Sequence, residues 1–216
     1  YGFPIELTRE LARERGLEIN EEEYTRLMEQ HREISRAGVP GGNAQRAADF
    51  AANAGFRSDF VGYGKTEVLT QIGALEPIED DLFLVKLRES PFYPAGGGQV
   101  TDSGWVEHDG TGARAELEEA FRLEDDQVLV LRGEGFAAGD RVRAVVPWGV
   151  RFPTMANHTG THLLHQALRE TLGEHVHQAG SAVRPDKLRF DFTHGAALTE
   201  DERDRVERRV NETVFE

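Results

Sequence analysis

The stretch Leu82-Phe83-Leu84-Val85-Lys86-Leu87 opens a region in which short apolar segments alternate with turn signals. The later apolar segments are Ala113–Leu117, Val128–Leu131 and Val142–Val146. The turn signals between them are His108-Asp109-Gly110, Asp125-Asp126 and Gly133–Gly139. Short strands at this spacing are typical of a small β-barrel. We expect its first strands at Phe60-Val61-Gly62-Tyr63 and Val68–Ile72.

Helical patterns precede the predicted barrel. Residues 5–37 have apolar residues at helical spacing, interrupted at Gly16, and Asn20 can cap the second helix with Glu23 as its capping-box partner. A glycine- and proline-rich stretch, 38–42, ends that helix. The alanine-rich segment Asn43–Ala54 is compatible with another helix.

Helical patterns also follow the predicted barrel. A helix over about 155–172 is expected to begin after Pro153 and to end at Gly173. Thr199 and Glu202 form a capping box for a last helix, with Leu198 as its staple. Its buried stripe is predicted at Val206, Val210 and Val214, which are also the candidates for apolar surface left exposed if the domain is incomplete. The predicted fold class is α+β.

Composition limits the classes of protein. The 216 residues are 38% hydrophobic and 30% charged, as in a globular protein, and the absence of cysteine excludes disulfides and thiolate metal ligands. No apolar run is long enough for a transmembrane helix and no leader is recognisable, so we expect a cytoplasmic protein without a membrane partner. The composition leaves the oligomeric state open.

The net charge of −14 argues against a general nucleic-acid-binding surface, but it leaves room for a local RNA contact through a few arginines. The sequence lacks an initiator Met, and its last residues lie in a helical pattern without a stop signal. We therefore expect a segment of a longer protein, the alternative being a short natural chain.

His158-Thr159-Gly160-Thr161-His162 is the first candidate site. Histidines four residues apart lie on one helix face, and two neutral imidazoles can bind one divalent metal, most often zinc. They supply only half of a zinc site, and a chance pair is the alternative. His165 lies one turn further along and is a candidate third ligand or, as we favour, a group that orients a ligand.

Two other stretches are candidates. In Pro91–Gln99, three consecutive glycines can approach another surface or a ligand closely, or form an anion-binding nest, and Gln99 can orient a substrate or a water. The alternative is a strained barrel turn. The stretch Lys187–His194 alternates basic and aromatic residues and can face an RNA end. On pattern alone we favour a half-buried strand with Arg189 and Asp191 outside.

Together these stretches resemble the alanyl-tRNA synthetase family and its editing relatives. The stretch 157–165 resembles the first half of the family's zinc motif, and 91–99 with Asp102 and Gly104 resembles its glycine-rich barrel motif. Further matching blocks are Gln178-Ala179-Gly180-Ser181, Leu188-Arg189-Phe190-Asp191-Phe192 and Tyr1-Gly2-Phe3-Pro4-Ile5-Glu6-Leu7-Thr8. The last block resembles the synthetase's tRNA-recognition helices, which freestanding editing proteins lack.

The resemblance implies a division into the tail of the tRNA-recognition region (1–58), a β-barrel (59–150) and the first half of an editing domain (151–216). It implies zinc at His158 and His162, with a Cys and a His about a hundred residues further on as the remaining ligands. Catalytic roles are implied for Thr161, Gln178 and Gln99, and substrate binding for Gly96, Gly97, Gly98 and Arg189.

The family ligates alanine to tRNA(Ala) with ATP and Mg and hydrolyses mischarged seryl- and glycyl-tRNA(Ala). The motifs that bind ATP would precede Tyr1, so we expect this segment to carry part of the editing machinery and to be inactive alone. The alternatives are a freestanding trans-editing deacylase, a non-catalytic RNA-binding module and an unrelated α+β protein with two chance histidines.

Overall fold

The computed structural model describes residues 20, 23, 26 and 43–215. Its elements in chain order are α3 (Asn43–Asn53), β1 (Asp59–Phe60), β2 (Glu67–Pro77), β3 (Leu82–Leu87), β4 (Glu89–Ser90), β5 (Trp105–His108), β6 (Arg114–Leu123), β7 (Asp126–Arg132), β8 (Arg141–Val145), α4 (Trp148–Leu172), β9 (Gln178–Val183), β10 (Leu188–Phe192) and α5 (Glu200–Phe215). The predicted helices over 5–37 otherwise lie outside the described residues. The Glu23 backbone N–H donates to Asn20 Oδ1 at 3.0 Å, as expected for the predicted cap.

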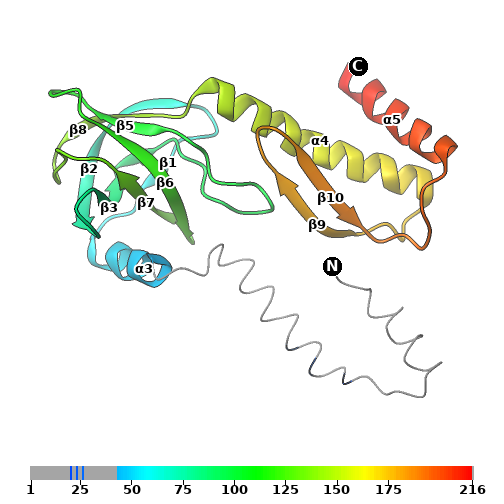
Figure 1. Cartoon of the computed structure of the whole chain (residues 1–216), viewed down its shortest axis with the longest axis horizontal. Coiled ribbons are helices and arrows are strands. Elements are labelled where there is room, and N and C mark those ends of the chain that lie inside the picture. The colour runs from blue at the N-terminus through cyan, green and yellow to red at the C-terminus, as the bar shows by residue number, and fades with distance from the viewer. Residues whose placement is uncertain (1–19, 21–22, 24–25, 27–42, 216) are drawn as a thin grey trace.

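Six antiparallel strands form the closed barrel predicted from the sequence, in the order β2-β3-β7-β6-β5-β8 (Figure 1). With the helices around it, the barrel gives the predicted α+β class. Strand β3 is buried along its whole length because it has apolar neighbours on both faces. Phe83, Val85 and Leu87 belong to the barrel core, whereas Leu82 and Leu84 pack with Ala47 and Phe50 of α3.

One predicted strand is wrong, and one strand of the barrel was not predicted. Phe60–Tyr63 is not a strand, since only Asp59 and Phe60 form β1 and a turn follows. A Cβ on Gly62 would lie 2.3 Å from the Pro91 carbonyl oxygen, so this turn is set by close contact with another segment. Strand β5 was missed; it has four residues and closes the barrel between β6 and β8.

Helix α4 begins at Trp148, seven residues before its predicted start at 155, and contains Pro153. A proline removes one helical hydrogen bond, and its cost is offset here by what the first turns contact. Arg151 is buried and donates hydrogen bonds to Pro91 and Asp102 in the segment between β4 and β5, which holds the helix in place ahead of the proline. The predicted end at Gly173 is confirmed. None of the described helices combines the length and apolar character that a bilayer span requires.

The last part of the chain packs along α4, as Figure 1 shows. Strands β9 and β10 form an antiparallel pair beside the helix, and α5 lies against it. The predicted capping box is present: the Thr199 backbone N–H donates to Glu202 Oε2 at 2.8 Å. Leu198 packs on the same cluster as Val206, which is buried. Val214 was expected in the buried stripe but is 57% exposed, because it lies on the last turn of α5 beyond that cluster.

Candidate functional site

Gly96, Gly97 and Gly98 form a tight hairpin turn that ends at Gln99. Gly96 and Gln99 exchange two backbone hydrogen bonds of 3.0 Å, and the two residues between them, Gly97 and Gly98, have φ angles of +59° and +84°. Positive φ at both central positions is what a type I′ turn requires and what glycine adopts without strain. The backbone conformation of the turn is therefore sufficient to explain why Gly97 and Gly98 are glycines.

This turn lies directly against strand β9. The Val183 N–H donates to the Gly98 carbonyl at 2.8 Å, and the Val100 N–H donates to the Val183 carbonyl at 3.1 Å. A Cβ on Gly98 would lie 2.3 Å from Ser181 Oγ. A segment that belongs to the barrel in sequence thus becomes a third strand-like edge of the β9–β10 pair. The sequence expectation of close approach to another surface is correct for Gly98.

Gln99 and His158 meet across this junction although they are 59 residues apart. Gln99 Oε1 lies 2.7 Å from His158 Nδ1, and the Gln99 residue is only 7% exposed. His158 is half-buried on α4, and the exposed His162 has its ring centroid 5.1 Å away with 40° between the ring planes. The two imidazoles therefore lie side by side, as the helical spacing predicted.

His158 and His162 can supply two of the ligands that a zinc ion needs. Two neutral imidazoles are suitable ligands, but within residues 20, 23, 26 and 43–215 no three His, Cys, Asp or Glu side chains come together to hold a metal ion. His165 joins no such group. Its ring packs 5.1 Å from Phe190, and its Nε2 is buried with no hydrogen-bond partner among the described atoms. His158 and His162 remain the candidate ligands.

The other predicted site residues are placed differently. Thr161 is buried, and its hydroxyl donates to the Asn157 carbonyl at 2.8 Å. Gln178 is exposed at the start of β9 and donates to Ser181 Oγ at 3.0 Å, which links it to the residue under Gly98. Arg189 is exposed on β10 and pairs with Asp191 at 3.0 Å. The structure thus joins Gln99 and His158 by a hydrogen bond, whereas the Arg189 side chain pairs with Asp191 and makes no hydrogen bond to either of them among the described residues.

Sequence reasoning missed the residue that fixes α4 to the barrel. Arg151 Nη2 lies 2.6 Å from Asp102 Oδ2, and both side chains are almost completely buried. The same guanidinium donates to the carbonyls of Pro91 and Gly62. Asp102 also accepts the Tyr93 N–H at 2.7 Å. The available signal was a single arginine between Val150 and Phe152 in an otherwise uncharged stretch.

These bonds hold both ends of the glycine-rich segment. Tyr93 and Asp102 stand at its two ends, and the backbone between them carries Gly96–Gln99. Burial raises the pKa of the Tyr93 phenol, so this side chain is neutral over the physiological range. The segment is therefore anchored to the barrel on one side and to β9 on the other.

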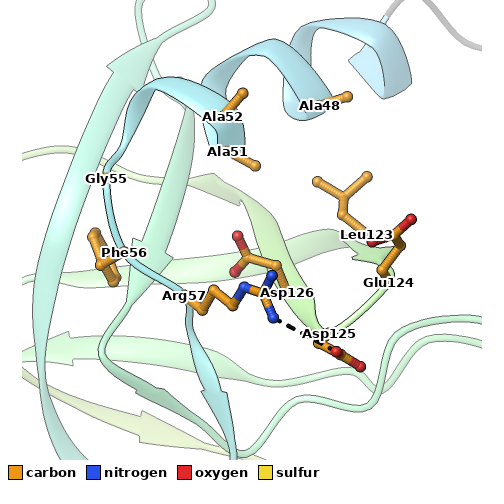
Figure 2. Close-up of a pocket in the computed structure, with 10 residues that line it drawn as sticks. All are labelled: Ala48, Ala51, Ala52, Gly55, Phe56, Arg57, Leu123, Glu124, Asp125 and Asp126. Atoms are coloured by element: carbon orange, nitrogen blue, oxygen red, sulfur yellow. Dashed lines mark ion pairs between the residues drawn. The ribbon is translucent and has the colours of Figure 1, made fainter.

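A separate hollow with a volume of about 600 Å³ lies on the barrel beside α3 (Figure 2). Its walls are formed by alanines of α3 and by the β6–β7 turn. Two of its lining residues, Arg57 and Asp125, form an ion pair at 3.5 Å. It shares no residue with the site around Gln99. The Asp126 carboxylate in its lining is also 2.5 Å from Nζ of the fully buried Lys86, which gives this carboxylate a structural role.

Comparison with known proteins shows which family this chain resembles. The model of the family described as tRNA synthetases class II (A) matches residues 1–149. The alanine–tRNA ligase of Rubrobacter xylanophilus is 44% identical over 212 residues, covering 96% of this chain and 24% of that protein. Those of Thermotoga petrophila and Listeria welshimeri are 39% and 38% identical over the whole chain and 26% of their own length. The chain spans about a quarter of these relatives.

Proposed function

The chain belongs to the alanyl-tRNA synthetase family, tRNA synthetases class II (A), and on this basis we propose that it is a segment of an alanine–tRNA ligase that carries part of an editing site for mischarged tRNA. The whole protein would ligate alanine to tRNA(Ala) with ATP and Mg, using residues outside this chain. The segment would contribute to the hydrolysis of seryl- and glycyl-tRNA(Ala). It would act where the ligase acts, in the cytoplasm.

A synthetase specific for alanine has a physical need for such a site. A binding pocket shaped for a methyl side chain cannot exclude glycine, which is smaller, and rejects serine poorly, because one added hydroxyl changes binding by little. A second site that hydrolyses the wrong aminoacyl ester then provides the missing discrimination. The residues that distinguish serine from alanine must contact its hydroxyl, and Thr161 and Gln178 are our candidates.

The observation that carries the proposal is the contact between Gln99 and His158. They come from different motifs of the family resemblance, and the 2.7 Å hydrogen bond joins the glycine-rich segment to the histidine helix. Gln178 approaches the same junction through Ser181, against which Gly98 lies. Residues that a chance resemblance would scatter over the molecule instead gather at one boundary between the barrel and α4.

The chain's own residues would hold the site together. His158 and His162 would bind zinc, which as a Lewis acid would supply polarisation of the ester carbonyl or activation of a water. Gln99 would fix the His158 ring, and the Gly96–Gln99 turn would form one wall. The exposed Gln178 would lie where an aminoacyl group can reach it. The family resemblance implies that the remaining metal ligands lie downstream.

Two alternatives make different predictions. A freestanding editing enzyme should have no synthetase counterpart over residues 1–40, yet the family match begins at residue 1, which favours the synthetase segment. A non-catalytic RNA-binding module would use the barrel alone. It would not need the hydrogen bond between Gln99 and His158.

A deacylation assay with seryl-tRNA(Ala) tests the proposal. We expect little turnover by this chain alone and full turnover by a longer protein that includes the downstream ligands. In that longer protein, His158→Ala should lower the rate by at least the roughly 10- to 100-fold that loss of a ligand-orienting group costs. His177→Ala, at an exposed histidine to which no site role is assigned, should leave it unchanged.

Two results would contradict this assignment. Rapid hydrolysis by the 216-residue chain alone would show that the site is complete without downstream residues. An unchanged rate and zinc content in the His158→Ala protein would remove the histidines from the chemistry and favour the RNA-binding module.

A further inference from the structure

We propose that Gln99 is a positioning residue for His158: its amide oxygen accepts the Nδ1–H of the imidazole and so leaves Nε2 unprotonated and available to a divalent metal. From the sequence alone, Gln99 was a candidate for orienting a substrate or a water. The structure instead joins its side-chain oxygen to a ring nitrogen. The use of Nε2 by zinc rests on the proposed function, whereas the hydrogen bond itself does not.

The chemistry of the two groups fixes the direction of this bond. An amide oxygen can only accept a hydrogen bond, so a nitrogen 2.7 Å from it must carry a proton. A neutral imidazole carries one proton, so a protonated Nδ1 leaves a lone pair on Nε2. A hydrogen bond at one ring nitrogen thereby decides which nitrogen can bind a metal.

The backbone around Gln99 makes this orientation durable. Its N–H and carbonyl are both used in the turn with Gly96, and the flanking Gly98 and Val100 are bonded to Val183 of β9. The residue is 7% exposed, so water has little access to replace the contact. The backbone that presents the Gln99 amide to His158 is therefore held both by the turn and by its bonds to β9.

His162 shows that the arrangement is directed at one of the two rings. It is exposed, and its ring lies beside that of His158 at 5.1 Å between centroids. The hydrogen bond from the Gln99 side chain goes to His158. We infer that His158 is the preset ligand and that His162 completes the pair by adjusting to the ion.

Nuclear magnetic resonance of the whole ¹⁵N-labelled chain, stripped of metal, tests the tautomer directly. Near pH 9, well above the ordinary histidine pKa of about 6.5, long-range ¹H–¹⁵N spectra identify the protonated ring nitrogen. The His158 signals are those lost in His158→Ala. We expect Nδ1–H in the unmodified chain and in Gln99→Glu, whose carboxylate also accepts, but a shift toward Nε2–H in Gln99→Met.

Gln127→Met is the matched control. Gln127 is as buried as Gln99, but its amide donates to the Phe92 carbonyl at 2.7 Å. This substitution should leave the His158 signals unchanged. Nε2–H in the unmodified chain, or an unaltered Nδ1–H pattern in Gln99→Met, would overturn the proposal.

Titration with zinc chloride of the same variants, made in the longer protein that includes the downstream ligands, separates this inference from the proposed function. In that protein Gln99→Met should bind zinc about 10- to 100-fold more weakly than the unmodified protein, with Gln99→Glu close to it. Equal zinc affinity in Gln99→Met despite an altered tautomer would overturn the role in metal binding. The expected tautomers with no zinc bound to the pair would uphold the hydrogen bond and count against the zinc-dependent hydrolysis proposed above.

Discussion

Arg151 and Asp102 form a buried ion pair, with Nη2 2.6 Å from Oδ2, at the point where helix α4 leaves the barrel. The pair is supplemented by two backbone carbonyls on the arginine and by the Tyr93 N–H on the aspartate. Nearly all the hydrogen-bonding capacity of both groups is thus used away from water. Such a pair is costly to break from one side, because the remaining charge stays buried.

Removal of one partner should therefore destabilise the chain strongly. We expect Asp102→Ala to lower the free energy of unfolding by about 3–5 kcal/mol, as measured by urea denaturation. Glu67→Ala is the matched control, because Glu67 pairs with Arg143 at 2.7 Å with both side chains about half exposed. Its effect should stay below about 1 kcal/mol. Similar effects at the two sites would show that the buried pair has no special weight.

Gly98→Ala should detach the glycine turn from β9. The new Cβ would lie 2.3 Å from Ser181 Oγ and 2.8 Å from its carbonyl oxygen, at a φ of +84°. We expect a cost of about 1–3 kcal/mol and faster hydrogen exchange of the Val183 amide. Gly96→Ala, which meets nothing within 4 Å and has no positive φ, should leave this amide protected. Unchanged protection in Gly98→Ala would argue against a fixed contact.

The first turn of α5 should be sensitive to acid. The backbone and hydroxyl hydrogen bonds from Thr199 lower the pKa of Glu202 below its ordinary 4.5. A lowered carboxyl pKa stabilises the folded state above the ordinary value, and this contribution is lost as the pH falls through the lowered pKa. Glu202→Gln should remove that part of the pH dependence, as followed by amide exchange at Arg203, whose N–H donates to the Thr199 carbonyl.

Val206 and Val214 provide a matched pair on one helix. Val206 is 6% exposed in the cluster between α4 and α5, whereas Val214 is largely exposed. Val206→Ala should cost about 1.5–3 kcal/mol, because the buried side chain loses its contacts. Val214→Ala should change stability by less than about 0.5 kcal/mol. A large loss at Val214 would reveal that another surface covers it, and thermal unfolding measures both variants.

Local signals in the sequence were sufficient where the structure is determined locally. The continuous apolar run of β3, the end of α4 at Gly173 and the capping box at Thr199 were all predicted from neighbouring residues. The barrel followed from the spacing of short strands, and the pairing of two histidine rings followed from helical periodicity.

Features set by distant contacts could not be predicted in this way. Strand β5 is too short to show a pattern, and α4 starts early because Arg151 is bound by residues 49 and more positions away. Val214 breaks the predicted stripe because nothing in the described cluster reaches the last turn of α5. The contact of Gln99 with His158 depends on the glycine turn reaching β9, which no local pattern encodes.

The sharing of the glycine turn between the barrel and β9 limits how this part of the chain can be rearranged. A division at residue 150 would pass through α4 and would separate Arg151 and Val183 from their partners in the barrel. One fragment would keep Asp102 and Gly98, and the other would keep Arg151 and Val183, so each group would lose its hydrogen-bond partner. A chimera of two relatives should therefore fold only when the glycine turn, Arg151 and β9 all come from the same parent protein.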